Sequence, residues 1–171
     1  MSEIFNCCCN PSNKKDQTPI STVFENYYED RLKLNPLEAT MIGDPRYNHV
    51  FLIDISQSHK DSLKNFYTGY LNRLQTYDRN ALSETEQLSY DILKWECSII
   101  LEDLSFHSEL IPINQFESMH LTMGQFAGGT SVQPFKTVKD YENWLMRLDG
   151  FVVWCDTAIE NMKRGMKQGY V

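Results

Sequence analysis

The spacing of apolar side chains is the feature that most constrains how this chain can fold. From residue 20 onward, apolar residues recur at steps of three and four, as in Phe24, Tyr27, Tyr28 and Leu32. This period places them on one face of an α-helix. The sequence carries no β-hairpin signal, and its only short strand candidate is the segment 50–55, VFLIDI. We therefore expect an all-α protein of about five or six helices in an irregular antiparallel array.

Helix start and stop signals divide this region into segments. Pro36 suits the first position of a short second helix, which we expect to stop at Gly43. Glu29 and Lys33 stand four residues apart and are expected to form an ion pair on the first helix. Residues that commonly cap a helix start precede four of the segments: Ser21 or Thr22, Ser56 or Ser58, Ser83 with Glu86 as a capping box, and Thr137.

The longest acidic stretch follows the capping box. The helix that begins there carries Leu88, Ile92, Trp95 and Ile99 on one face. We interpret the acidic residues around it as a solvated outer face, because they are spread around the helix and do not converge as metal ligands would. Seven acidic residues lie between positions 81 and 110, against one basic residue: Glu84, Glu86, Asp91, Glu96, Glu102, Asp103 and Glu109.

The C-terminal part begins with a long connection, residues 107–136, which contains several Pro and Gly residues. A connection of this length in a compact domain is often functional, and we expect one short helix near His120 to Ala127. A further helix follows, and Gly150 is expected to break or kink it. The last helix should end at Gly169, a natural stop.

Charge and composition exclude several classes of protein. The 171 residues hold 16 basic and 23 acidic side chains, so the net charge is −7. We expect no nucleic-acid partner, because phosphate binding needs a basic surface. The chain also lacks the run of about 18 apolar residues that a transmembrane helix requires, so a membrane is expected as a partner only through a lipid anchor.

Residues 1–19 are interpreted as a disordered tail or tether, because the segment is polar after its cysteines and contains two prolines. Cys7, Cys8 and Cys9 are candidates for lipidation, since a cysteine before a polar tether is how many processed bacterial lipoproteins begin. That hypothesis requires a start codon upstream of Met1 and places the protein in the cell envelope or periplasm. Otherwise the segment is a cytoplasmic tail with reactive thiols. No second pair of ligands follows at the spacing of a zinc finger.

No complete catalytic motif is present. The sequence contains no HExxH, paired CxxC, glycine-rich phosphate loop or GxSxG, so we assign no catalytic residue, metal ligand or cofactor to it. Asp44 and Arg46 either pair to organise their loop or line a site. Asn114, Gln115 and His120 lie on the long connection. They either satisfy backbone groups or bind a peptide-like ligand from the wall of a cleft.

The ordered set of segments over residues 22–171 resembles the N-terminal part of the bacterial domain-of-unknown-function 885 family. The matching segments are FENYYEDRLKLNPLEATMIGDPRYN, LSETEQLSYDILKWE, LIPINQ with His120 after it, QPFKTVKDYENWLMRL and AIENMKRGMKQGYV. The resemblance implies a larger helical protein, similar to zinc metallopeptidases of the gluzincin type. In such proteins an HExxH helix of the C-terminal half holds the metal, and none of those residues is on this chain.

From the resemblance we expect an N-terminal fragment, from a truncated or split gene, that is not catalytic alone. Residues 20–171 would then be an incomplete domain that walls one side of a substrate cleft. Its partners would be the missing C-terminal region and, in the full-length form, zinc and a peptide substrate. The alternative is an autonomous helical binding or scaffold domain. A fragment should leave a broad apolar face uncovered, whereas an autonomous domain should have a closed core.

Overall fold

The computed structural model describes residues 18–116, 118–129 and 132–170, and within these ranges it contains helices and loops but no strand. The all-α prediction is therefore confirmed, and the segment 50–55 is a loop. The α-helices of the described residues are α1 (Ile20–Leu34), α2 (Pro36–Met41), α3 (Gln57–Leu74), α4 (Glu84–Asp103), α5 (Met119–Ala127) and α6 (Val138–Gln168). The short 3-10 helices are η1 (Pro45–Tyr47), η2 (Arg79–Ala81) and η3 (Ser108–Leu110).

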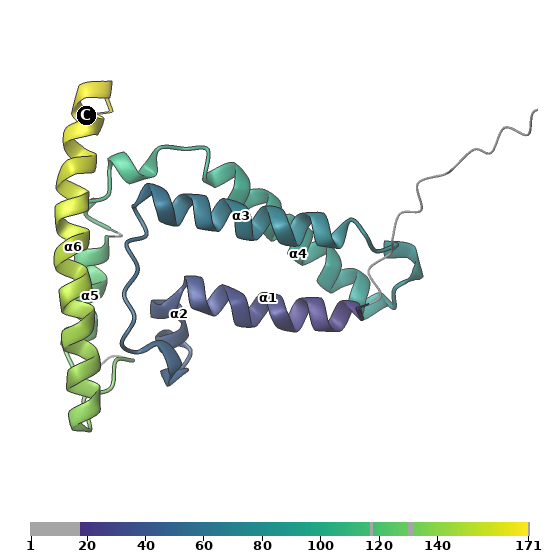
Figure 1. The fold of residues 1–171 in the computed structure, drawn as a ribbon, viewed down its shortest axis with the longest axis horizontal. Coiled ribbons are helices and arrows are strands. Elements are labelled where there is room, and N and C mark those ends of the chain that lie inside the picture. The colour runs from purple at the N-terminus through teal and green to yellow at the C-terminus, as the bar shows by residue number, and fades with distance from the viewer. Residues whose placement is uncertain (1–17, 117, 130–131, 171) are drawn as a thin grey trace, which may run out of the picture.

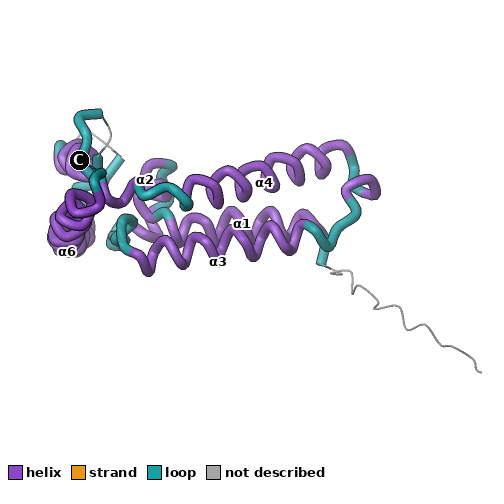
Figure 2. The backbone as a smooth tube through the Cα atoms, turned by 90° about the horizontal axis from the view of Figure 1, so that it is seen from above, coloured by secondary structure: helices purple, strands orange, loops and turns teal. Residues whose placement is uncertain are grey.

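The helices form two units, which we call the arm and the α5–α6 unit (Figure 1). α1, α3 and α4 lie side by side in the arm, where α1 and α4 run toward α6 and α3 runs away from it. α6 crosses one end of the arm, and α5 lies against α6. Figure 2 shows the same arm from above, with α6 seen nearly along its axis.

Three of the four expected side-chain caps are present. The side chains of Ser56, Ser83 and Thr137 each accept a hydrogen bond from a backbone N–H in the first turn of the helix that follows. α1 is the exception, because it begins at Ile20 directly after Pro19 and neither Ser21 nor Thr22 caps it. Proline supplies no side-chain acceptor, so the start of α1 was not readable from cap chemistry.

The arm encloses the first core, in which aromatic rings from α1 and α3 meet. The Tyr27 ring stacks on Phe66 with centroids 5.6 Å apart and meets Tyr70 edge-on at 5.1 Å. α4 contributes Cys97, which is fully buried and acts as a small hydrophobic residue. Burial raises the pKa of this thiol to about 11, so it is protonated and unreactive at neutral pH.

α4 buries a different face from the one that its sequence pattern suggested. Its buried residues include Tyr90 and Leu93, whereas a second apolar stripe of the same helix points away from the core. This stripe, the α4 outer row, consists of Leu88, Ile92, Trp95 and Ile99, all of them exposed. A helical period identifies a stripe but does not say which of two stripes on one helix packs inward.

The second core lies where α5 meets α6 and is built around Met123, Phe126 and Trp144. Arg147 of α6 lies next to it and is completely buried. The Arg147 guanidinium donates to backbone or side-chain oxygens in two other segments. The acceptors among the described residues are the carbonyls of Pro36, Tyr47 and Val50, the Thr40 hydroxyl and the Gln133 amide oxygen. All are neutral, and burial lowers the pKa of Arg147 to about 10, so the group remains protonated at pH 7.

α6 is one continuous helix, so the expected break at Gly150 is wrong. A Cβ added at Gly150 would lie 2.8 Å from the Cβ of Phe51, closer than side-chain atoms normally approach. The glycine therefore permits close contact between the helix and the loop before α3. Gly43 and Gly169 do follow helix ends with positive φ, as a stop requires.

Replacing Gly150 by Ala should destabilise the protein by about 1–3 kcal/mol, because the new methyl group overpacks the contact with Phe51. Gly69, in the middle of α3, is the matched control, since a Cβ there meets no atom within 4 Å. Gly69→Ala should be neutral or stabilising by up to about 1 kcal/mol, because alanine favours the helix. Urea denaturation of both variants measures the difference, and equal effects would contradict this account of Gly150.

Replacing Arg147 by Met should destabilise the protein by roughly 3 kcal/mol, because several buried oxygens lose their donor while the cost of burying a charge is relieved. Arg147→Lys keeps the charge but not the planar fork of donors, so it should also lose stability. Chemical denaturation gives both values. Wild-type stability in the lysine variant would show that charge alone suffices.

Candidate functional site

Three adjoining cavities surround the first turns of α3, where the arm meets α6. The largest has a volume of about 350 Å³ and lies between α3, η3 and the last turns of α6. Its titratable lining residues are Lys60, Asp61, Lys64, His107, Glu109 and Arg164. A second cavity of about 300 Å³ shares Lys60 and Glu109 with the first. These volumes are in the range of small-molecule sites.

A buried ion pair forms the wall between the two larger cavities. Lys60 Nζ lies 2.7 Å from Glu109 Oε2, and the two side chains are 14% and 8% exposed. Burial alone raises the pKa of Glu109, but hydrogen bonds from Lys60, from its own backbone and from His107 outweigh burial and lower it. Glu109 is therefore a carboxylate at neutral pH. It was expected on a solvated face, and this expectation is wrong.

The smallest of the three cavities, about 180 Å³, brings a histidine near a carboxylate. It is lined by residues of α2 together with Asp54 and His59. Asp54 Oδ1 accepts a hydrogen bond from the indole nitrogen of Trp154 at 2.6 Å. Burial lowers the pKa of His59, although the charge of Asp54 opposes this, so the imidazole is mainly neutral at pH 7. The region offers fixed charges and hydrogen-bonding groups for a polar ligand.

The residues proposed for a cleft wall lie elsewhere. Asn114, Gln115 and His120 are all exposed, and none of them lines the three cavities. Asn114 is engaged in a local turn, because its side-chain oxygen accepts from the N–H of Phe116 at 2.8 Å. Its backbone N–H also donates to the hydroxyl of Ser118 at 2.7 Å. The structure thus places these residues on one connection but not in a shared hollow.

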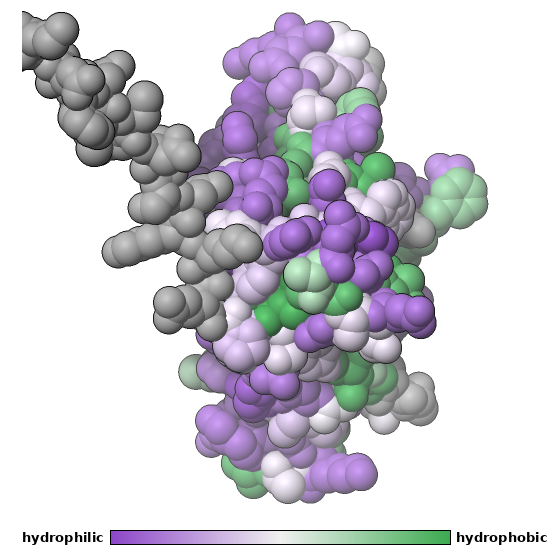
Figure 3. Space-filling view, turned by 90° about the vertical axis from the view of Figure 1, so that its right-hand side faces the viewer, coloured by the Kyte–Doolittle hydropathy of each residue, from purple (hydrophilic) through white to green (hydrophobic). Residues whose placement is uncertain are grey.

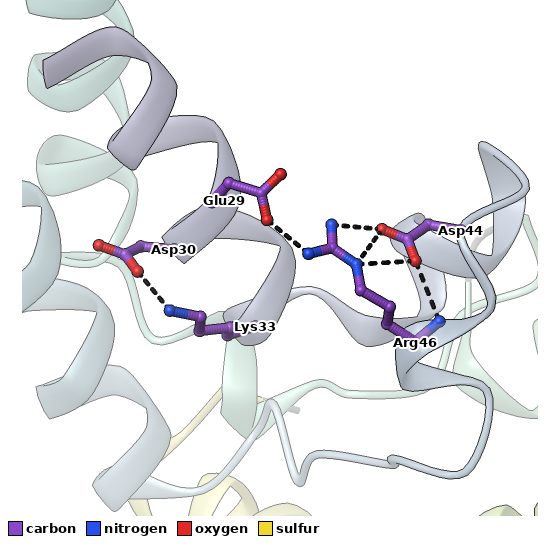
Figure 4. A network of polar contacts seen from close by, with 5 residues as sticks. All are labelled: Glu29, Asp30, Lys33, Asp44 and Arg46. Atoms are coloured by element: carbon purple, nitrogen blue, oxygen red, sulfur yellow. Dashed lines mark hydrogen bonds and ion pairs between the residues drawn. The ribbon is translucent and has the colours of Figure 1, made fainter. Parts of the chain in front are cut away.

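Asp44 and Arg46 form a polar network at the loop after α2 (Figure 4). Arg46 Nη2 lies 2.6 Å from Asp44 Oδ2, and Arg46 Nη1 lies 2.6 Å from Glu29 Oε2. Hydrogen bonds from the Arg46 side chain and backbone lower the pKa of Asp44. The predicted ion pair between Glu29 and Lys33 is absent from this described network, because Lys33 instead pairs with Asp30 at 2.6 Å (Figure 4).

Sequence reasoning missed Lys60, His59 and Glu109, the residues that the cavities bring together. Lys60 and Glu109 are 49 positions apart, so no local spacing connects them. The position of Glu109 on the long connection after α4 was the available signal, because connections of that length often carry functional groups. Cys7, Cys8 and Cys9 lie outside the described residues.

The described residues lack two features that would indicate a metal site or a membrane span. No group of three or more His, Cys, Asp or Glu side chains comes together there in a way that could hold a metal ion. Zinc sites need at least three such ligands, so the described residues do not fit one. Among the same residues, no helix is both long and apolar enough to span a bilayer.

The model of a family described as "Bacterial protein of unknown function (DUF885)" matches residues 36–171. No curated protein and no solved structure matches the chain.

Replacing Lys60 by Ala should destabilise the protein by about 1–3 kcal/mol, because it leaves the Glu109 carboxylate buried without its cation. Lys64→Ala is the control, since Lys64 lines the same cavity but is exposed. That change should stay within about 0.5 kcal/mol. Urea denaturation measures both, and equal losses would show that the Lys60–Glu109 contact is not the source.

The same ion pair predicts a pH dependence. The pKa of Glu109 is lower in the folded chain than in the unfolded chain, where a Glu titrates near about 4.3. Its contribution to stability is therefore present above that value and is lost as the pH falls through the lower pKa of the folded chain. Glu109→Gln should flatten this part of the stability profile in acid, and an unchanged profile would contradict the assignment.

Proposed function

The chain belongs to the family described as bacterial proteins of unknown function (DUF885), and on this basis we propose that it is the N-terminal helical part of a larger metallopeptidase-like protein. The likeness of full-length members to gluzincin-type zinc metallopeptidases, which the family resemblance implies, is the reason for this proposal. We assign no catalytic step to this chain, since its described residues do not fit a zinc site. Zinc and the catalytic groups belong, in the proposal, to the C-terminal half of full-length members.

The observation that carries the proposal is the uncovered α4 outer row. Trp95 is 66% exposed, and Leu88 and Ile92 are also more than half exposed. A shallow groove of about 210 Å³ between α1 and α4 continues this surface, with Phe24 and Tyr27 among its lining residues. Soluble monomers rarely leave such a contiguous apolar surface open. We propose that the remainder of the protein packs on it.

Apolar side chains also reach the surface at the end of the arm. Figure 3 looks onto the end remote from α6 and shows hydrophobic residues in green between hydrophilic ones in purple. The surface at this end of the molecule is therefore mixed rather than continuously polar.

In the proposal, the polar cavities around the start of α3 face the substrate cleft of the full-length protein. Their charged groups suit the backbone and termini of a peptide substrate. Asn114 and Gln115, on the connection before α5, and His120, in the first turn of α5, would wall the same cleft, and the pair of Asp44 and Arg46 would organise a loop at its edge. Lipidation at one of Cys7, Cys8 or Cys9, with a location in the cell envelope, also remains a proposal.

A second candidate function is an autonomous helical binding or scaffold domain. The observation in its favour is that the arm and the α5–α6 unit each enclose a core and that buried hydrogen bonds from Arg147 tie α6 to the segment of α2 and η1 that follows α1. Such a chain would melt cooperatively as a stable species without further protein. The two candidates differ in what covers the α4 outer row.

Replacing Trp95 by Glu separates these candidates when it is made in two proteins. In this chain the change should alter the free energy of unfolding by no more than about 0.5 kcal/mol, because Trp95 is exposed. At the matching position of an intact family member, the same change should cost about 3 kcal/mol or more, because the carboxylate would enter a packed interface. A negligible cost in both proteins would refute the proposed covering of α4 and favour the autonomous domain.

The cleft assignment has its own test. In an intact family member, Asn114→Ala and His120→Ala at the matching positions should lower kcat/KM for peptide hydrolysis by about tenfold each, since each would remove a hydrogen bond to substrate. Thr122→Ala, on the same helix as His120, is the control. Unchanged kcat/KM in the first two variants would remove these residues from the cleft.

A further inference from the structure

The largest cavity combines apolar and cationic groups on walls that come from two helices and η3. Leu104 and Leu110 supply its apolar lining, and Leu110 is almost completely buried. Lys64 of α3 and Arg164 of α6 supply cations, and both residues are exposed. A hollow of about 350 Å³ that joins an apolar lining to a few charged groups has the usual form of a small-ligand site.

The walls of this cavity are held in place by close packing and buried hydrogen bonds. A Cβ added at Gly165 of α6 would lie 2.9 Å from the carbonyl oxygen of Leu110, so α6 and η3 are in direct contact. Asn161, one turn earlier on α6, is buried and donates to the carbonyl of Ile55 at 2.9 Å. The Asn161 side-chain oxygen accepts from Arg164 Nη2 at 3.1 Å, which orients the guanidinium. The cavity is therefore a preformed part of the fold.

The anionic side chains around the cavity are already engaged, whereas two of its cations are not. Glu109 is paired with Lys60, so these two side chains add no net charge. Asp61 Oδ1 accepts a hydrogen bond from a neighbouring glutamine amide at 2.9 Å. Among the described residues, no carboxylate lies within ion-pair distance of Lys64 or Arg164. Lysine and arginine thus outnumber acidic side chains in this lining, although the net charge of the protein is −7.

We propose that the largest cavity binds the carboxylate of a small ligand that also carries an apolar group. Lys64 and Arg164 bind the carboxylate, and the apolar group lies against Leu104 and Leu110. Hydrogen bonds from lysine and arginine to a carboxylate are stronger than those between neutral groups. The C-terminal end of a peptide with an apolar last side chain has this chemistry, and so does a free short-chain acid.

The two sources of the ligand differ in their relation to the proposed function. With a peptide end as the ligand, the inference rests on the proposed function, because the cavity then receives one end of the substrate. With a free acid as the ligand, it depends only on residues of this chain. The proposed function is tested by the covering of α4 and by kcat/KM in an intact family member. Its failure is therefore distinguishable from a failure of this chain to bind a carboxylate.

Titration of the full chain with N-acetyl-alanyl-leucine, followed by heteronuclear NMR, tests the proposal. We expect a Kd of about 1 mM and shifts of backbone amides in the first turns of α3 and the last turns of α6. The C-terminal amide of the same dipeptide should bind at least about tenfold more weakly, because it lacks the negative charge. Isocaproate separates the two sources. If this free acid binds as tightly as the dipeptide, the carboxylate site is confirmed with a free acid as its ligand, and weaker binding identifies a peptide end.

Lys64→Gln and Arg164→Gln should each raise the Kd of the dipeptide by about fivefold, since each removes a charged donor. Lys167→Gln is the matched control. It removes the same charge from the last turn of α6 but lies outside the cavity lining, so it should leave Kd within about twofold. Asp61→Asn should lower Kd by about twofold, because it removes a repulsive charge from the lining. All four residues are exposed, so the variants should melt like the wild type.

Four results would overturn the proposal. The first is a dipeptide amide that binds as tightly as the acid, and the second is unchanged binding in the Lys64 and Arg164 variants. The third is inorganic phosphate that binds more tightly than either acid, because the cavity would then recognise charge without the apolar group. The fourth is a titration in which shifts lie away from the cavity or do not occur.

Discussion

The burial of one arginine that has no carboxylate partner among the described residues is the constraint on which the arrangement of the two units depends. Arg147 is fully buried, and neutral oxygens from the segment around α2 and η1 and from the loop before α6 surround its guanidinium. A buried cation is tolerated only where its donors are satisfied. The chain meets this requirement because residues 36–50 pack against α6 and supply acceptor oxygens to Arg147. The loop after Val50 leads to Ser56, which caps α3, and the cavities lie around the start of that helix.

Much of this architecture could be predicted from local chemistry. The capping boxes at Ser83 and Thr137, the short helix after Pro36 and the stop at Gly169 each depend on residues within one or two turns, and these signals were sufficient. The predictions that failed concerned residues whose role depends on partners far away in the sequence. A glycine such as Gly150 is typical of a helix break, but its role here is set by its contact with Phe51, which is 99 positions away. α4 has two apolar stripes, and only the position of α1 and α3 decides which of them is buried.

The candidate site shows the same difference between contacts that are local in the sequence and contacts that are distant. Asp44 and Arg46 are two residues apart, and their pairing was one of two readings that the sequence offered. Lys60 and Glu109 are brought together by the fold, and each separately reads as a solvated charge. The sequence therefore does not predict which charged side chains are buried, because burial depends on how the helices pack together and not on any one segment.

The joint between the arm and the α5–α6 unit also affects how the protein unfolds. Each unit has its own apolar core, while the Arg147 guanidinium holds α6 to the segment of α2 and η1, which follows α1, through directional hydrogen bonds. Apolar contacts weaken gradually when neighbouring elements move, but hydrogen bonds are lost over a small displacement. We therefore expect the two units to unfold as separate cooperative units once these hydrogen bonds are lost. Native-state hydrogen exchange should register the opening of α6 as a cooperative event distinct from the unfolding of the arm.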